Sequence, residues 1–386
     1  MKVALTPIDT VFFRDSTPFD QGTHPQDGVR SVFPPFPPTV AGALRAALAR
    51  DHGWDGRSPW NAALVAALGD GPDVGPLRIT GPIVLYGDAP VFPLPRHVAV
   101  GPSEPQTAAG AGWRATGWYV PGPRVESDLG RVRLPVWRSA MGATDAREHG
   151  DKASRSARLW VTDTGLRQIL EGQLPSSADL LDASALWVDE PRVGLQRASA
   201  TRTAERGMLY STFHARLRPG VRIGVEVAGL PRDWSTLVDG RRTGPCTIAL
   251  GGEGRLATVA PWHGLARDAP AREEARRTRR LTLVALTPLR LARGAILGGV
   301  PLAPGLRVAC ACADRSLRIG GWDARHRAPL PLTNAVAPGT TLFCEVVDAR
   351  DALALDLAHG FIRVGRDVST GFGLCAVARD PWEEMP

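Results

Sequence analysis

Lysine is almost absent from this chain of 386 residues, which contains only Lys2 and Lys152. A Walker-type phosphate loop needs a lysine after a glycine-rich run, and neither lysine stands in one, so ATPase chemistry of that type is excluded. A dinucleotide-binding fingerprint needs its glycines between a strand and a helix, whereas Gly371-Phe-Gly373 precedes a predicted strand. The usual motifs of zinc proteases and of α/β-hydrolases are missing as well.

Long apolar segments and zinc-like cysteine spacings are also missing. No apolar run approaches the roughly 20 residues that span a bilayer, so no membrane partner is expected. The N-terminal residues enter an alternating pattern at once, without a signal peptide, which predicts a cytoplasmic protein. The five cysteines are odd in number, and we expect them to be small buried hydrophobic residues rather than metal or redox ligands. The sequence predicts no cofactor and no metal.

Arginine carries nearly all of the positive charge. The chain has 46 Lys and Arg against 39 Asp and Glu, a net charge of +7, and the excess is concentrated. Residues 191–222 contain seven arginines and one acid (7 − 1 = +6), and residues 131–158 contain seven basic and three acidic residues (7 − 3 = +4). Arginine forks pair with phosphate and stack on bases, so this distribution favours a nucleic-acid partner over a simple solvated surface.

A duplicated pattern divides the chain into two similar halves. Residues 3–8 read VALTPI and residues 284–289 read VALTPL, and each copy leads to a glycine-rich loop near the end of its half. We call residues 250–255 the first glycine loop and residues 365–373 the second glycine loop. Glycine lets backbone N–H groups approach a phosphate without side-chain obstruction, so the two loops predict a pair of related polyanion-binding modules.

The order of predicted elements indicates an α+β fold made of two tandem ferredoxin-like (RRM-like) βαββαβ domains. We expect a first domain at 1–263 with a large, irregular insertion at about 87–158, a charged connector at 264–280, and a second domain at 281–386. The first domain is predicted to contain strands at 2–13, 77–86, 208–218, 221–228, 246–250 and 255–260. The strands at 208–218 and 221–228 alternate like neighbouring strands. The second is predicted to contain strands at 281–291, 306–313, 341–347 and 372–378, with a helix at 352–362.

A helix at 40–50 is predicted to follow the proline-rich segment 32–38, with Thr39 as its cap. The free N–H groups at such a helix start form an anion site in principle. We therefore expect residues 39–45 and the first glycine loop to line one phosphate-binding surface. A second short helix is predicted at 166–174.

Six short segments, taken in their order along the chain, resemble one known family. They are Phe13-Arg-Asp15 with Pro18-Phe19, Pro37 to Arg45, Arg192-Val-Gly-Leu195, Ala204 to Tyr210, Gly320-Gly-Trp-Asp323, and Pro338 to Phe343. They are similar to the RAMP proteins of CRISPR systems and, among these, to the family of the third subunit of the type III-B Cmr effector complex.

The resemblance implies a non-catalytic subunit of an antiviral ribonucleoprotein that holds the 5′ tag of a CRISPR guide RNA. It also implies that this subunit joins the large polymerase/cyclase-like subunit to the first subunit of the Cmr backbone, which itself cuts target RNA, so that this chain meets target RNA only indirectly. The residues predicted to bind RNA are Arg14, Thr39, Gly42, Arg45, Arg192, Arg197, Arg202, Arg206, Gly251, Gly252, Arg255, Arg363, Arg366, Gly371, Phe372 and Gly373. No catalytic residue is predicted.

Two alternatives stay open at the level of sequence. One is a metal-independent endoribonuclease that matures CRISPR transcripts, with His359 beside the second glycine loop as the base. A helix end next to Gly360 explains the same histidine. The other alternative is a scaffold protein whose arginines contact acidic protein surfaces.

Overall fold

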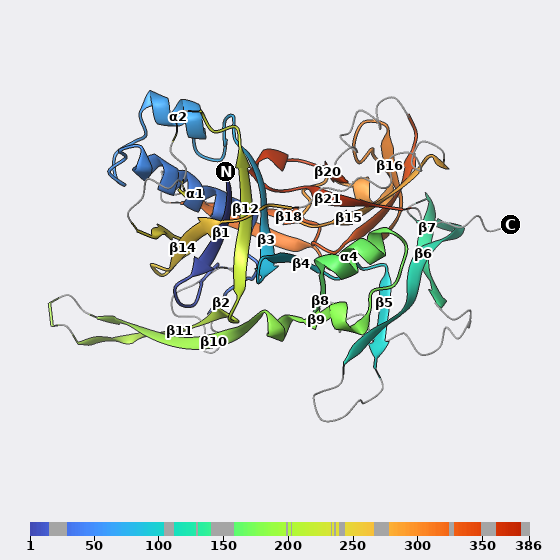
Figure 1. Cartoon of the computed structure of the whole chain (residues 1–386), viewed down its shortest axis with the longest axis horizontal. Coiled ribbons are helices and arrows are strands. Elements are labelled where there is room, and N and C mark those ends of the chain that lie inside the picture. Colours follow the sequence, from blue (N-terminus) through green and yellow to red (C-terminus); the bar gives the residue numbers. More distant parts are fainter. Residues whose placement is uncertain are drawn as a thin grey trace. The chain divides into compact units, whose positions relative to one another are not determined.

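The computed structural model describes residues 1–14, 29–103, 112–128, 130–139, 158–197, 200–201, 203–232, 234, 237–238, 244–265, 278–323, 328–348 and 360–379, with the backbone alone at 196–197 and 204–210. The protein is α+β, with mostly antiparallel sheets and few helices (Figure 1). Two compact units share the chain. The first contains Met1–Asp88, Ser184–Gly264 and Arg318–Thr333, and the second contains Ala89–Ala183, Leu265–Leu317 and Asn334–Pro386.

The sheet of the first unit is built around the first copy of the repeat. Its antiparallel strands lie in the order β13 (Cys246–Ala249), β14 (Leu256–Pro261), β1 (Lys2–Pro7), β12 (Val221–Ala228) and β3 (Arg78–Tyr86). Val3, Ala4 and Leu5 of β1 are fully buried. Helix α1 (Pro37–Asp51) contacts β13 and β3, and it buries an apolar residue every fourth position along one stripe. The short helix α2 (Ala62–Leu68) follows it.

The second unit repeats this strand order with the second copy. Its antiparallel strands are β20 (Phe361–Arg363), β21 (Leu374–Ala378), β15 (Arg280–Ala285), β19 (Thr341–Val346) and β16 (Leu306–Cys312). In both sheets a hairpin that contains the glycine loop forms one side, and the repeat strand lies next to it. The short sequence repeat therefore marks the equivalent strand of two sheets with one topology.

Three smaller sheets and a sheet segment complete the described structure. In the first unit, β10 (Trp187–Arg197) and β11 (Ala204–Leu217) form a long ribbon, yellow-green in Figure 1, to which β2 (Val29–Arg30) adds in parallel. Strands β17 (Leu317–Asp323) and β18 (Ala328–Ala335) pair with each other. The second unit contains β5 (Val98–Pro102), β6 (Trp113–Ser127) and β7 (Gly130–Ser139), and separately β4 (Ala89–Pro93), β8 (Leu159–Thr162) and β9 (Leu180–Asp182) with helix α4 (Asp163–Leu170). Short 3-10 turns occur at Ser177–Asp179, Ala183–Ala185, Ala295–Leu297 and Val368–Thr370.

The described part of residues 87–158 is more regular than the sequence predicted. Strands β6 and β7 pair over most of their length, with a register shift between Pro121 and Arg124. The sequence did not predict β6 because it contains prolines and glycines, which are typical of loops. The irregular register of β6 and β7 accommodates these residues, whereas an unbroken strand ladder would exclude them. Residues 89–183 group with the second compact unit. Compact units are defined by packing, whereas an insertion is defined by chain connectivity. The grouping therefore does not test the predicted domain boundaries, which stay a prediction.

Several local predictions were wrong. Helix α1 begins at Pro37, with Phe36 at its N-cap and no side-chain cap, so Thr39 is not the capping residue. Two prolines can occupy a first helical turn, whose N–H groups have no intrahelical acceptor in any case. Strands β11 and β12 do not pair with each other, since β11 pairs with β10 and β12 with β1 and β3. Strand β1 ends at Pro7 rather than near Phe13.

Most of the helix predicted at 352–362 lies outside the described residues, as does most of the connector at 264–280. All five cysteines are buried and free, which confirms their predicted role as small apolar residues. Within the described parts of the chain, no helix has the length and apolarity needed to cross a membrane.

Candidate nucleic-acid interface

The first glycine loop packs against the segment that follows β1. At Gly251, φ is +84°, and a Cβ there would lie 2.6 Å from the carbonyl oxygen of Phe12, so the loop requires glycine. The Gly252 N–H donates to this same oxygen at 2.8 Å. This N–H already has an internal acceptor. That the first glycine loop binds a phosphate stays a prediction.

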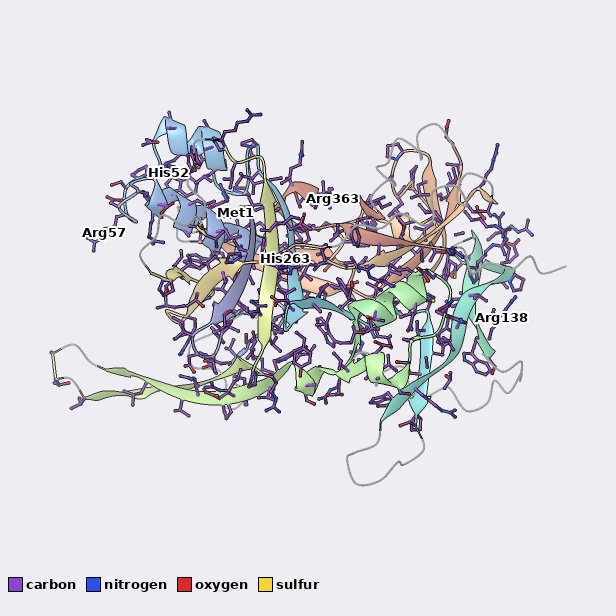
Figure 2. The ribbon with its side chains drawn as sticks, in the orientation of Figure 1. Met1, His52, Arg57, Arg138, His263 and Arg363 are labelled. Atoms are coloured by element: carbon purple, nitrogen blue, oxygen red, sulfur yellow. The ribbon has the colours of Figure 1, made fainter. Side chains whose placement is uncertain are left out.

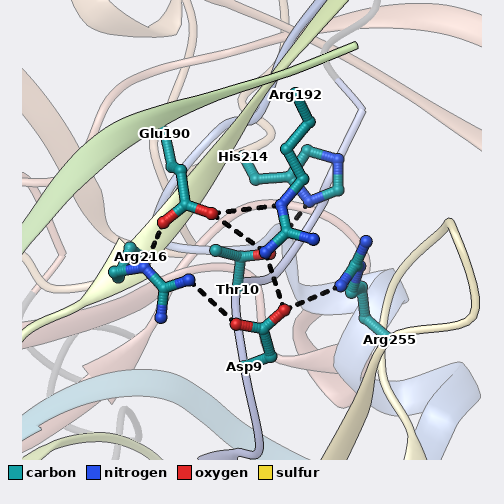
Figure 3. A network of polar contacts seen from close by, with 7 residues as sticks. All are labelled: Asp9, Thr10, Glu190, Arg192, His214, Arg216 and Arg255. Carbon is teal, nitrogen blue, oxygen red and sulfur yellow. Dashed lines mark hydrogen bonds and ion pairs between the residues drawn. The ribbon is translucent and has the colours of Figure 1, made fainter. Parts of the chain in front are cut away.

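A carboxylate beside this loop joins three arginines (Figure 3). Oδ2 of Asp9 accepts hydrogen bonds from Arg192 Nη2 at 2.7 Å and from Arg255 Nη1 at 3.0 Å. Its Oδ1 accepts one from Arg216 Nη2 at 2.9 Å. Glu190 accepts from Arg192, at 3.1 Å from Nε and 2.9 Å from Nη2, and also from Arg216 Nε. We call these five residues the Asp9 network.

The β10–β11 pairing assembles the network from residues far apart in the sequence. Glu190 lies opposite His214 in the register, and alternate residues of a strand share a face, so Arg192 and Arg216 lie on the face of Glu190. Asp9 follows β1 and Arg255 ends the first glycine loop. The sequence predicted Arg192 and Arg255 but missed Asp9, Glu190 and Arg216. Two signals were present in the sequence: Arg216 belongs to the arginine-rich residues 191–222, and Asp9 directly follows the repeat.

Mutual neutralisation keeps the network ionised. The hydrogen bond from Arg216 lowers the pKa of Glu190 below its ordinary value. Desolvation raises the pKa of Asp9, but the hydrogen bond from Arg216 and the charge of Arg192 outweigh it, so the net shift is downward. The two carboxylates raise the pKa of Arg216 in turn. Three guanidinium groups against two carboxylates leave a charge of 3 − 2 = +1.

His214 lies beside the network in a buried position. Its Nδ1 is 3.1 Å from Thr10 Oγ1, its ring stacks on Phe12 with centroids 4.8 Å apart, and it is 2% exposed. Burial, followed by the charges of Arg255 and Arg192, lowers its pKa. A neutral, buried imidazole that connects β11 to the segment after β1 has a structural role here.

The second glycine loop has the same hairpin position but different surroundings. At Gly373, φ is +80° and a Cβ would lie 2.3 Å from the Val364 carbonyl oxygen. Arg290, directly after the second repeat, donates through Nη1 to Asp367 Oδ2 at 2.7 Å. Its guanidinium carbon lies 4.2 Å from the ring centroid of Phe372, which is fully buried. Phe372 therefore supports the loop from the core and offers no exposed ring to a base.

Arginines outnumber acids around this second loop. Arg363, labelled in Figure 2, donates to the Val368 carbonyl at 3.3 Å. Arg293 and Arg366 are exposed and make no ion pair within the described residues. Counted over residues 290–293, which follow the second repeat, and residues 363–373, Arg290, Arg293, Arg363 and Arg366 against Asp367 give 4 − 1 = +3. At the first loop, Arg192, Arg216 and Arg255 against Asp9, Glu190 and Glu253 give 3 − 3 = 0.

The other residues predicted to bind RNA are dispersed. Gly42 is exposed on α1, with no atom within 4 Å of a Cβ placed there, and Thr39 lies in the first turn of the same helix. Arg45 is buried and donates to the carbonyls of Gly71 and Asp73 at 2.8 and 3.0 Å, which gives it a structural use.

Arg14 is exposed and its backbone bridges to Ser31. Gly371 has a φ of +108° and ends the 3-10 turn of the second loop. Arg202, His359 and the side chains of Arg197 and Arg206 lie outside the described residues. Among the described residues, no group of three or more His, Cys, Asp or Glu side chains could hold a metal ion.

Comparisons with known proteins identify similar chains. A family model described as "CRISPR-associated protein (Cas_Cmr3)" matches residues 3–379. No curated protein matches the sequence. A chain in the structure of the type III-B Cmr-beta bound to cognate target RNA and AMPPnP is 15% identical, with 89% of this chain and 86% of that chain covered and a TM-score of 0.47. A chain of the Csm1-Csm4 cassette in complex with pppApA is 16% identical, with 89% and 87% covered and a TM-score of 0.35.

Proposed function

We propose a guide-RNA-binding role for this chain, which belongs to the CRISPR-associated Cas_Cmr3 family and is thereby a type III CRISPR effector component. In this proposal it is the third subunit of a type III-B Cmr complex. It holds the 5′ tag of the CRISPR RNA without cleaving RNA. It also joins the large polymerase/cyclase-like subunit to the Cmr backbone, and it meets target RNA only through the guide.

The strand order supports two tandem ferredoxin-like domains. If β1, β3, β12 and β14 are counted as strands one to four of the first sheet, their order is fourth, first, third, second. Strands β15, β16, β19 and β21 of the second unit have the same order. Two interleaved split β-α-β units place the strands in this way, because each pair of parallel strands encloses one strand of the other pair. Strands β13 and β20 then extend the sheets at the glycine-loop hairpins.

The charge around the second glycine loop is the observation that carries the RNA-binding proposal. Its excess of +3 includes the exposed side chains of Arg293 and Arg366. Arginines that neutralise backbone phosphates supply most of the affinity for nucleic acid, independent of base sequence. Gly371 and Gly373 have positive φ angles, and the pair of Arg290 with Asp367 ties the loop to the segment after β15, so Arg366 is presented from a loop anchored at this side.

Sequencing the RNA that copurifies with the assembled complex tests this function. We expect RNAs that share one repeat-derived 5′ end, because a subunit that holds a tag selects molecules that carry it. An RNA-free complex, or RNA with unrelated 5′ ends, would contradict the proposal and favour the scaffold alternative.

The non-catalytic part of the proposal has its own test. Wild-type protein is incubated with labelled repeat RNA under single-turnover conditions, with and without magnesium, and we expect no cleavage. Acid–base cleavage needs a positioned base and a group that stabilises the developing charge. The buried His214 offers no accessible base. Cleavage that disappears in His359→Ala would instead establish the endoribonuclease alternative.

A further inference from the structure

Asp9 connects three arginines that no other described residue brings together. Arg192 belongs to β10, Arg216 to β11, and Arg255 to the end of the first glycine loop, whereas Asp9 follows β1. The Asp9 carboxylate bonds to all three at 2.7 to 3.0 Å. Among the described residues, Glu190 bonds only to the two arginines of its own hairpin. Asp9 is therefore the shared acceptor that links the arginines of the β10–β11 ribbon to the arginine of the glycine-loop hairpin.

We infer that Asp9 is a positioning residue, which holds Arg192, Arg216 and Arg255 as one binding site for the phosphates of single-stranded RNA. The inference rests on the proposed function and extends it from the second glycine loop to the first. The role of Asp9 is to orient the guanidinium groups, and it does not contact the RNA itself.

Unused donors in the network support this assignment. One terminal nitrogen of each guanidinium, Nη1 of Arg192, Nη1 of Arg216 and Nη2 of Arg255, has no hydrogen-bond partner among the described residues. Nε of Arg255 is buried and also makes no hydrogen bond there. An arginine fork that is already oriented loses less side-chain entropy when it binds a phosphate, so a fixed cluster binds more tightly than the same arginines free.

Asp9 could also weaken RNA binding, because its negative charge competes with phosphate for the arginines. The two effects have opposite signs. If competition dominates, removal of the charge tightens binding. If orientation dominates, removal of the charge weakens binding, even though the surface becomes more positive. The sign of the change therefore decides between them.

The experiment compares Asp9→Asn with Glu253→Gln in the full chain. Glu253 lies in the first glycine loop and makes no ion pair within the described residues, so the control removes one charge nearby without releasing an arginine. Affinity for a single-stranded RNA with a repeat-derived 5′ end is measured over a range of salt. We expect Asp9→Asn to bind about tenfold more weakly, as for the loss of one charge-assisted hydrogen bond. Its salt slope should flatten by roughly 0.7 to 1.4, or one to two phosphates. Glu253→Gln should bind as the wild type does or slightly more tightly.

Two further variants guard against a purely structural effect. Asp9→Glu keeps the carboxylate and should restore part of the affinity and of the salt slope. Glu190→Gln leaves Asp9 bonded to all three arginines, so this variant should lose less affinity than Asp9→Asn. If Asp9→Asn does not fold, Glu190→Gln takes its place in the comparison with Glu253→Gln. Equal or tighter binding by Asp9→Asn overturns the inference while the proposed function stands. A wild-type protein that binds no RNA overturns the proposed function.

Discussion

The two glycine loops lie in equivalent hairpins, and the residue that pairs with each loop has the opposite charge in the two units. Each loop closes a hairpin beside a strand that ends in the VALTP repeat, and the second residue after the shared proline forms an ion pair with its loop. In the first unit this residue is Asp9, 3.0 Å from Arg255, and in the second it is Arg290, 2.7 Å from Asp367. The pair is thus charge-swapped between the modules.

The swap separates a structural requirement from a functional one. An ion pair links the segment after the repeat to its loop in both units, whether the acid lies after the repeat, as in the first unit, or in the loop, as in the second. The link therefore does not depend on which of the two residues is the acid. The surrounding charges do differ, with a balance of 0 at the first loop and +3 at the second. The two hairpins therefore share strand order and position, whereas the charges around them differ.

The largest expected effect is the loss of stability when a loop glycine is replaced. Gly373→Ala places a Cβ 2.3 Å from a carbonyl oxygen at a positive φ, and Gly251→Ala places one at 2.6 Å. We expect each to lower the free energy of unfolding by about 2 kcal/mol or more. Gly42→Ala, in open space on α1, should instead stabilise the protein by up to about 1 kcal/mol. Urea unfolding measures all three, and an unaffected Gly373→Ala would show that the loop adjusts.

The charge swap predicts that the second ion pair can be reversed. Arg290→Asp leaves two acids facing each other and removes the guanidinium from Phe372, so it should cost about 2 kcal/mol of unfolding free energy. Adding Asp367→Arg recreates the polarity of the first unit and should recover about half of that loss. No recovery in the double variant would mean that the two pairs are not equivalent.

Replacing the exposed Arg293 and Arg366 should weaken RNA binding without destabilising the fold. Arg293→Ala with Arg366→Ala removes two positive charges that make no ion pair within the described chain. We expect the salt slope of binding to flatten by about 1.4, because each phosphate contact on a single strand contributes roughly 0.7. Replacing Arg197 and Arg206 by alanine should flatten the salt slope by about 1 to 1.5 if the arginine-rich residues 191–222 also contact phosphates. An unchanged slope with failed assembly would assign the arginines to protein contacts.

The smallest expected effect is on acid stability. The folded pKa values of Asp9 and Glu190 lie below their ordinary values, so their contribution to stability is present above about pH 4.5 and is lost as the pH falls through the folded values. Both side chains are partly exposed, which limits the contribution to about 1 kcal/mol. Between pH 6 and pH 3, wild type should lose more stability than Asp9→Asn. Equal losses in urea titrations would remove Asp9 from the acid response.

The sequence predicted what depends on local pattern. The repeat located the central strands β1 and β15, and most of the other strands of both sheets were found within a few residues, because buried strands show continuous apolar runs. Strands β6 and β7 were missed because their prolines and glycines imitate loops.

The Asp9 network could not be predicted, since its acids and arginines meet only through strand pairing between distant segments. The buried environment of Arg45, which is among the residues predicted to bind RNA, could not be predicted either. Its buried bonds to the carbonyls of Gly71 and Asp73 depend on how the loop after α2 folds back, which no spacing reveals.

Photo-crosslinking of a guide RNA labelled in its 5′ tag, followed by mass spectrometric mapping within the assembled complex, determines whether this chain holds the tag. We expect crosslinked peptides of this chain from the second glycine loop, around residues 363–373, and from the arginine-rich strands β10 and β11. Crosslinks to this chain that avoid both regions, or a tag that crosslinks only to other subunits, would contradict the assignment of the chain as the tag-binding subunit.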